Sequence, residues 1–344
     1  KLGSTLHRLG FKETKSDTVY VDDIIITNSS GQAISNLIAK LNAEFPLKNL
    51  GKLHHFLGLE VQPASNGGLQ LSQTKYISNL LTKTNMSNAR LIKTLFAPST
   101  KLLADGTNQA QDPQLYRSVI GALHLMYAQV CTRPDIAFVV NALGRYLSDP
   151  GLGHWKAVKK VFRYLQGTKD HMLTYKKSDQ LQVIGYSDSD FAGCPNDRKS
   201  TSGFVFMMVG GAISWKSVKQ TLTAASTMEA EYVACYEATC QAVWLKNLIS
   251  GFHVVESISR PLVIYCDNTA AVHFSQNNRS STRSKHFDIK FLFVREKVLD
   301  SQTRIEYIAT ENMLADPMTK GLAIGIFQNH VTHMGVVKFF DVLD

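Results

Sequence analysis

Residues 181–320 show an order of strand and helix patterns that limits the fold of this chain more than any other feature of its sequence. The patterns are, in chain order, strands at 181–187, 204–209 and 213–215, a helix to about residue 249, a strand at 262–266, a helix at 287–299, a strand at 304–308 and a short helix at 312–320. The strand at 262–266 is almost continuously apolar, as is typical of a strand buried in a sheet. The order βββαβαβα predicts a mixed sheet with helices on its faces, of the α/β class.

Four acidic residues fall where such a sheet would bring them together. Asp188 follows the first strand, Glu231 lies in the first helix, Asp267 follows the buried strand and Asp316 lies in the last helix. Like charges held close together are unfavourable unless cations bind among them, and oxygen ligands favour Mg²⁺ or Mn²⁺. Two such ions can activate a water molecule and stabilise the leaving oxygen of a phosphodiester. The pattern therefore predicts a two-metal nuclease site, and we expect no small-molecule cofactor.

Two of these positions have acidic neighbours that compete for the same role. Glu229 and Glu231 differ by about 200° around a helix, so both cannot face the sheet. Glu229 suits a capping box with Ser226, whereas Glu231 shares a stripe with small and apolar residues, which favours Glu231 as the ligand. Asp188 and Asp190 would lie on the same strand face, so the pattern does not separate them. We prefer Asp188 and keep Asp190 as the alternate.

The first 180 residues combine strand and helix patterns of α+β type. Strand patterns flank Asp22 and Asp23, and a further pair at 56–61 and 69–72 is joined by a glycine turn, which predicts a hairpin. A helix pattern covers 34–45. Further helix patterns at 115–147 and 155–165 follow a polar segment at 101–114, with breaks where Arg133-Pro134 and Pro150-Gly151 should end helices. We expect domains at 1–100, 101–180 and 181–322, followed by a tail at 323–344.

Composition narrows the class of protein and its partners. Hydrophobic residues make up 44% and charged residues 19%, which excludes disordered, collagen-like and coiled-coil chains. The net charge of +9 favours a polyanionic partner such as nucleic acid. Five cysteines without zinc-type spacing indicate a reducing compartment. With no signal pattern, no long apolar stretch and no initial Met, we expect a fragment or processed product that is neither secreted nor bound to a membrane.

Several motifs in the chain together resemble one family. In the second half they are GYSDSDFAG (185–193), RKSTSG (198–203), MEAEY (228–232), YCDN (265–268), SKH (284–286) and LADPMTK (314–320). In the first half they are YVDD (20–23) followed by IIIT (24–27), FPLKNLG (45–51), FLGLE (56–60) and TRPDI (132–136). The set is similar to the C-terminal part of the Pol polyprotein of copia-type LTR retrotransposons. The second-half motifs resemble its ribonuclease H domain, and the first-half motifs resemble its reverse transcriptase.

This resemblance implies an activity, a site and partners. By motif, the ribonuclease H site falls on Asp188, Glu231, Asp267 and Asp316, with two Mg²⁺ or Mn²⁺ ions as cofactors. The implied activity is cleavage of the RNA strand of an RNA/DNA hybrid. The implied partners are that hybrid and other parts of the polyprotein, and the implied location is a virus-like particle in the cytoplasm, or the nucleus.

The reverse transcriptase half departs from the family pattern. Asp22 and Asp23 match metal ligands of the polymerase, but the third aspartate and the fingers would precede residue 1. In addition, residues 9–17 resemble a segment that normally precedes a strand pair, yet Val19 joins this segment directly to the catalytic strand. We therefore expect a truncated palm, thumb and connection region in which polymerase activity is lost.

Basic residues near the last two acids could follow a nucleic-acid backbone without reading its sequence. They are Arg279, Arg283, Lys285, His286 and Lys290. The alternative function is a catalytically inactive relic, or a nucleic-acid-binding module that keeps the fold but does not cleave. Metal-dependent cleavage separates these two readings.

Overall fold

The computed structural model describes residues 24–28, 30–45, 47–64, 67–98, 100, 102–103, 112–121, 125–252, 255–276 and 285–338. The chain divides into two compact units, 1–62 and 63–344. Asp22 and Asp23 lie outside the described residues, so the polymerase motif is not tested by the structure. The expected boundaries at residues 100, 180 and 322 stay predictions.

The described residues of the first unit form one helix and a short strand pair. Helix α2 (Gly31–Glu44) begins at Ser30, whose hydroxyl accepts from the Ala33 amide, and confirms the helix expected at 34–45. Strands β1 (His55–Phe56) and β2 (Leu59–Pro63) pair antiparallel. The single strand expected at 56–61 is therefore wrong. Leu57 and Gly58 both have positive φ, which turns the chain between the two strands, and Gly58 makes that turn easy.

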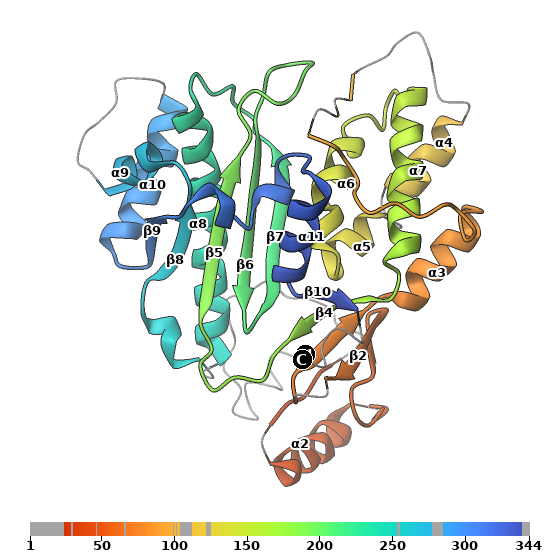
Figure 1. Cartoon of the computed structure of the whole chain (residues 1–344). Helices are drawn as coiled ribbons and strands as arrows, with labels where there is room; N and C mark the ends of the chain where they lie inside the picture. Colours follow the sequence, from red (N-terminus) through yellow and green to blue (C-terminus); the bar gives the residue numbers. More distant parts are fainter. Residues whose placement is uncertain are drawn as a thin grey trace. The chain divides into compact units, whose positions relative to one another are not determined.

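A five-stranded mixed sheet forms the centre of the second unit (Figure 1). Its strands are β5 (Val183–Ser189), β6 (Thr201–Met208), β7 (Gly211–Lys219), β8 (Leu262–Cys266) and β9 (Thr303–Tyr307). The order across the sheet is β7-β6-β5-β8-β9. The first three strands run antiparallel, and β8 and β9 add to β5 in parallel. The predicted α/β sheet is therefore confirmed.

The helices on this sheet differ in part from the sequence pattern. Helix α8 (Thr227–Phe252) packs on β5, β6 and β8, and α10 (Lys285–Leu299) packs on α8. Helix α9 (Thr269–Gln276) was not predicted; it begins where the Asn268 side chain accepts from the Ala271 amide. The helix expected at 312–320 is wrong, because two 3₁₀ turns, η3 (Thr310–Asn312) and η4 (Asp316–Met318), form there around Pro317.

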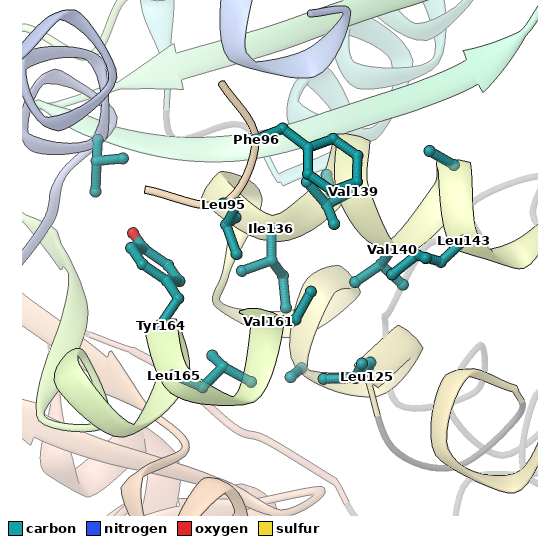
Figure 2. Close-up of a cluster of buried hydrophobic side chains, with 14 of the residues drawn as sticks. Leu95, Phe96, Leu125, Ile136, Val139, Val140, Leu143, Val161, Tyr164 and Leu165 are labelled. Atoms are coloured by element: carbon teal, nitrogen blue, oxygen red, sulfur yellow. The ribbon is translucent and has the colours of Figure 1, made fainter. Parts of the chain in front are cut away.

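A helical layer precedes the sheet in the chain. Its elements are α3 (Thr74–Lys83), α4 (Pro113–Ile120), α5 (Leu125–Cys131), η1 (Pro134–Ile136), α6 (Ala137–Gly144) and α7 (Leu152–Gly167). The breaks expected at Arg133-Pro134 and Pro150-Gly151 are confirmed. Figure 2 shows part of the core of this layer, where Ile136, Val140 and Leu165 are each fully buried. The same core includes Met313, Leu314, Ala315 and Met318 around η4, so the helical layer and the end of the sheet domain share one set of apolar contacts.

The segment expected to be a tail is part of the fold. Residues 323–338 form α11 (Ile324–His333) and β10 (Val336–Lys338). Strand β10 pairs antiparallel with β4 (His171–Tyr175), which also pairs with β3 (Leu69–Ser72). Gly335 has positive φ, and a Cβ there would meet the Gly210 carbonyl oxygen at 2.7 Å. Only glycine therefore fits where this segment passes the β6–β7 turn.

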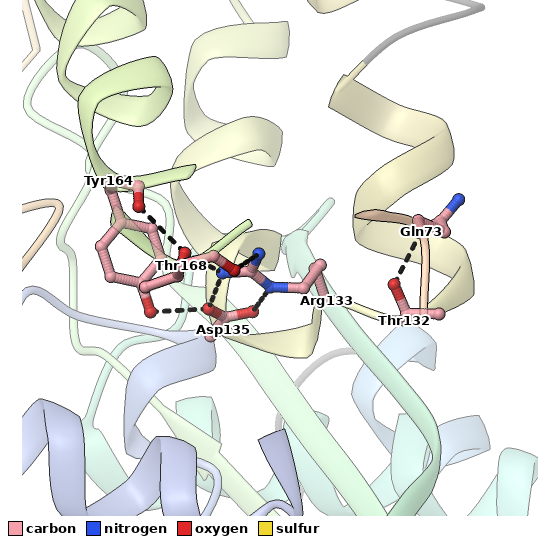
Figure 3. Close-up of polar contacts among 6 residues, drawn as sticks. All are labelled: Gln73, Thr132, Arg133, Asp135, Tyr164 and Thr168. Carbon is pink, nitrogen blue, oxygen red and sulfur yellow. Dashed lines mark hydrogen bonds and ion pairs between the residues drawn. The ribbon is translucent and has the colours of Figure 1, made fainter. Parts of the chain in front are cut away.

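A buried ion pair ties η1 to α7 (Figure 3). The Arg133 guanidinium donates to both Asp135 oxygens at 2.9 and 2.7 Å, and the Tyr164 hydroxyl donates to Asp135 at 2.6 Å. Arg133 also donates to the Thr168 carbonyl and hydroxyl oxygens. Burial alone would raise the pKa of Asp135, but Arg133 and Tyr164 hold it below its ordinary value. The pair therefore stays charged in the interior.

Removing one partner of this pair should be costly. We expect Asp135→Asn to lower the free energy of unfolding by about 3 kcal/mol or more, because Arg133 then stays buried without a compensating charge. Urea unfolding measures the change. The control is Asp197→Asn, which breaks the more exposed Lys219–Asp197 pair and should cost less than about 1 kcal/mol. Equal small losses for the two variants would contradict the expectation.

Candidate active site

The parallel pairing of β5 and β8 places two of the predicted acids at one edge of the sheet. Ser187 pairs with Cys266, so Asp188 and Asp267 both lie at the carboxyl ends of neighbouring parallel strands. Asp188 itself pairs with Gly203 on β6. A Cβ on Gly203 would meet the Met318 side chain at 2.5 Å, so the glycine allows η4 to approach the sheet. That approach brings Asp316 to the same edge.

The four predicted acids are gathered into two overlapping groups. Ligand atoms of Asp188, Asp267 and Asp316 all lie within 4.8 Å of one another, and so do those of Glu231, Cys266 and Asp267. Asp267 belongs to both groups. Residues from β5, α8, the end of β8 and η4 therefore meet at one place, although they are far apart in the sequence.

Burial makes this cluster electrostatically unfavourable without a cation. Asp188 is 1% exposed, Glu231 7% and Asp316 6%. Burial and then the charge of Asp188 raise the pKa of Glu231 well above its ordinary value. Burial raises the pKa of Asp188 to about 6, against the opposing effect of Lys320, and raises that of Asp316. The cluster therefore resists holding all its negative charges at once.

Lys320 and Thr319 are the partners of the cluster on its η4 side. The Lys320 ammonium lies 2.9 Å from Asp316 Oδ1 and 3.8 Å from Asp188 Oδ2. Its pKa is raised to about 12, because the two aspartates outweigh the effect of burial. The Thr319 hydroxyl donates to Asp188. One positive charge thus offsets part of the repulsion among the acids.

Asp190 and Glu229, the acids that compete with Asp188 and Glu231 as ligands, have other contacts. Asp190 accepts from the Thr201 amide, and burial raises its pKa to about 6. Glu229 accepts from the Ala225 amide at 2.9 Å, while the Ser226 hydroxyl accepts from the Glu229 amide, as expected for a capping role. Neither acid belongs to the two groups found among the described residues. The geometry thus favours Asp188 and Glu231.

The sequence reasoning missed Cys266 and Lys320. Cys266 is the last residue of β8 and lies directly before Asp267, so its position beside a predicted ligand was the available signal. Lys320 is four residues after Asp316, a spacing that allows a local ion pair.

The predicted nucleic-acid-binding residues are only partly described. Arg279 and Arg283 lie outside the described residues, and the side chains of Lys285 and His286 in α10 are likewise outside them. The Lys290 ammonium lies 5.0 Å from the centre of the Tyr236 ring, so this residue packs on α8. Within the described part of the chain, no helix is both long and apolar enough to cross a membrane.

Comparison with known proteins gives the family. Residues 11–98 match the model for "Reverse transcriptase (RNA-dependent DNA polymerase)". The chain is 35% identical over 353 residues to the Retrovirus-related Pol polyprotein from transposon RE1 of Arabidopsis thaliana, covering 98% of this chain and 24% of that protein. It is 30% identical over 241 residues to the putative transposon Ty5-1 protein YCL074W of Saccharomyces cerevisiae, covering 68% of this chain and 77% of that protein.

The chain belongs to the Pol polyproteins of copia-type retrotransposons. It spans about a quarter of the length of the RE1 polyprotein. Among solved structures, LC11-RNase H1 in complex with RNA/DNA hybrid is similar with a TM-score of 0.30 and 17% identity, over 40% of this chain and 94% of that one. The identity to the curated transposon proteins confirms, at the level of the family, the resemblance seen in the sequence motifs.

The raised pKa of Asp188 predicts a pH-dependent stability. Well below pH 4 this carboxyl is protonated in both the folded and the unfolded state, so it does not change the free energy of unfolding. As the pH rises to about 6, the folded state keeps a proton that the unfolded state has lost, and the free energy of unfolding falls. Without metal, Asp188→Asn should therefore stabilise the chain by about 1 to 3 kcal/mol at pH 7 and by much less near pH 4.

Thermal and urea unfolding in EDTA at the two pH values measure this difference. Asp300→Asn is the matched control, because Asp300 is exposed after α10 and its substitution should change stability by less than about 0.5 kcal/mol. A destabilised Asp188→Asn variant at pH 7 would show that the carboxylate is not under repulsion.

Proposed function

We propose that residues 181–322 act as a metal-dependent ribonuclease H that cleaves the RNA strand of RNA/DNA hybrids. The observation that carries the proposal is the gathering of Asp188, Glu231, Asp267 and Asp316 at one sheet edge, with ligand atoms within 4.8 Å in each group. Membership of the Pol family supports the substrate class, and the motifs that resemble that family's ribonuclease H domain include the same four residues.

The donor set of the cluster fits hard divalent cations. Carboxylate oxygens are the ligands that Mg²⁺ and Mn²⁺ prefer. Glu231 Oε2 has no hydrogen-bond partner among the described residues, so this buried oxygen is available to a cation. The raised pKa values of Asp188, Glu231 and Asp316 indicate that positive charge would be bound favourably. The four acids would then hold two Mg²⁺ or Mn²⁺ ions.

The chain's own groups would prepare the reaction by holding and positioning the ions. When bound, two divalent ions supply an activated water and stabilise the leaving oxygen of a phosphodiester. The four carboxylates would hold the ions, and the rigid β5 and β8 ends would fix their positions. Thr319 would orient Asp188 through its hydroxyl, and Lys320 would keep positive charge beside Asp188 and Asp316.

Hybrid binding would rest on the positive charge of the chain. The net charge of +9 favours a phosphate backbone. We assign the contacts to the basic set Arg279, Arg283, Lys285, His286 and Lys290. The remaining parts of the polyprotein would be the protein partners, and a cytoplasmic virus-like particle or the nucleus would be the location.

A cleavage assay with the full chain tests the nuclease. Mg²⁺ should support cutting of the labelled RNA strand of a hybrid, and EDTA should abolish it. Asp267→Asn should lower the rate by about 100-fold or more, because Asp267 belongs to both ligand groups. Asp300→Asn should cleave like the unaltered chain. Hybrid binding without cutting would instead support the alternative function, an inactive relic or binding module.

We further propose that residues 1–344 lack RNA-directed polymerase activity. The support is the direct join between the segment at 9–17 and the catalytic strand at Val19, which leaves no room for the strand pair that the family pattern places there. Primer extension on an RNA template should give no product above that of an Asp22→Asn/Asp23→Asn variant. Extension that this double substitution removes would overturn the proposal.

A further inference from the structure

One of the two ligand groups contains a thiol in addition to carboxylates. Cys266 Sγ, a Glu231 oxygen and an Asp267 oxygen all lie within 4.8 Å of one another, whereas the other group has oxygen ligands only. A thiolate prefers softer ions such as Zn²⁺ and Cd²⁺, and oxygen ligands prefer Mg²⁺. The two groups therefore differ in the metal that they favour.

An orphaned buried oxygen lies in the thiol-containing group. Glu231 is 7% exposed, and its Oε2 has no hydrogen-bond partner in the described part of the chain. A buried carboxylate oxygen without a partner is costly, so a cation beside it would be stabilising. Asp267 is half-buried, which leaves the group a route to solvent.

The surroundings of Cys266 decide how the group changes when a metal binds. Its side chain is fully buried beside Cys235 on α8 and makes a long contact of 3.9 Å with the Asn268 carbonyl oxygen. On binding, the S–H bond breaks, a sulfur–metal bond forms and the proton passes to solvent, with no change in oxidation state.

The spacing of the group is close to that of a zinc site. A tetrahedral Zn²⁺ with one sulfur and two oxygens holds its ligand atoms about 3.5 Å apart. The observed separations, within 4.8 Å, need side-chain shifts on the order of 1 Å to reach that geometry. A fourth position would remain for water, as in open zinc sites.

We propose that Glu231, Cys266 and Asp267 form a site for thiophilic divalent cations that overlaps the proposed Mg²⁺ site, and that its occupation inhibits the nuclease. The inhibitory part rests on the proposed function. Asp267 belongs to both groups, and Glu231 is needed for the Mg²⁺ site. An ion bound through Cys266 also binds these two carboxylates, so they are no longer available to Mg²⁺. Zn²⁺ and Cd²⁺ therefore act as antagonists of Mg²⁺ at this site.

Cd²⁺ titration of the full chain tests the site without any activity measurement. The readout is the ultraviolet charge-transfer band of a cadmium–thiolate bond. The background carries Cys131→Ser and Cys240→Ser, because these two cysteines are partly exposed and could bind cadmium independently. We expect one cadmium–thiolate bond per chain, lost in Cys266→Ser and in Cys266→Ala, and an affinity at least tenfold weaker in Glu231→Gln.

Two controls separate this site from its neighbours. Cys235→Ser removes the adjacent buried thiol and should keep the band, and Asp316→Asn alters only the oxygen group and should also keep it. Circular dichroism checks that each variant is folded. A band of full intensity in folded Cys266→Ser, or its loss in folded Cys235→Ser, would overturn the proposal. An unchanged affinity in Glu231→Gln would do the same.

Hybrid cleavage in a fixed concentration of Mg²⁺ tests the inhibitory part. Zn²⁺ should inhibit the unaltered chain at concentrations at least tenfold below those that inhibit Cys266→Ser. Equal inhibition of the unaltered chain and Cys266→Ser would contradict the inhibitory part of the proposal. If Mg²⁺ supports no cleavage by any variant, the proposed nuclease function fails, whereas the cadmium band still decides whether the thiol site exists.

Discussion

Repulsion among buried carboxylates is the main constraint on the structure around the acid cluster. Asp188, Glu231 and Asp316 are almost fully buried, and Asp267 lies within reach of all of them. Bringing several acids out of water at one place is unfavourable, and the raised pKa values record that cost. Lys320 offsets part of it with one charge. The arrangement therefore suits a cation-binding site. Holding the acids together without cations lowers the stability of the fold.

The scaffold that imposes this arrangement extends beyond the sheet. The parallel β5–β8 pair fixes Asp188 and Asp267, and α8 supplies Glu231 from the face of the sheet. Asp316 depends on η4, which packs against β6, α6 and η1 and shares its apolar core with the helical layer. The buried Arg133–Asp135 pair holds η1 in turn. Substitutions in the helical layer can therefore affect the acid cluster through η4, which carries Asp316.

Sequence reasoning found the acids but not all of their surroundings. Strand periodicity and the order of elements were enough to predict the sheet and to place Asp188 and Asp267 at the ends of its strands. The helical stripe separated Glu231 from Glu229, because a capping residue and a sheet-facing residue need different sides of the helix. The structure of η4 could not be predicted, since a 3₁₀ turn has no long periodicity and Pro317 was the only local signal. Cys266 was missed because its approach to Glu231 depends on α8 packing against β8, which is a tertiary contact.

The central claim is that the four acids form a site for divalent cations, and direct counting of bound Mn²⁺ tests it most simply. Electron paramagnetic resonance measures the free ion as the full chain is titrated. We predict that the unaltered chain binds two Mn²⁺ ions that the folded Asp188→Asn/Asp267→Asn variant does not bind, with Asp300→Asn behaving like the unaltered chain. Equal binding by the unaltered chain and the folded double variant would contradict the account.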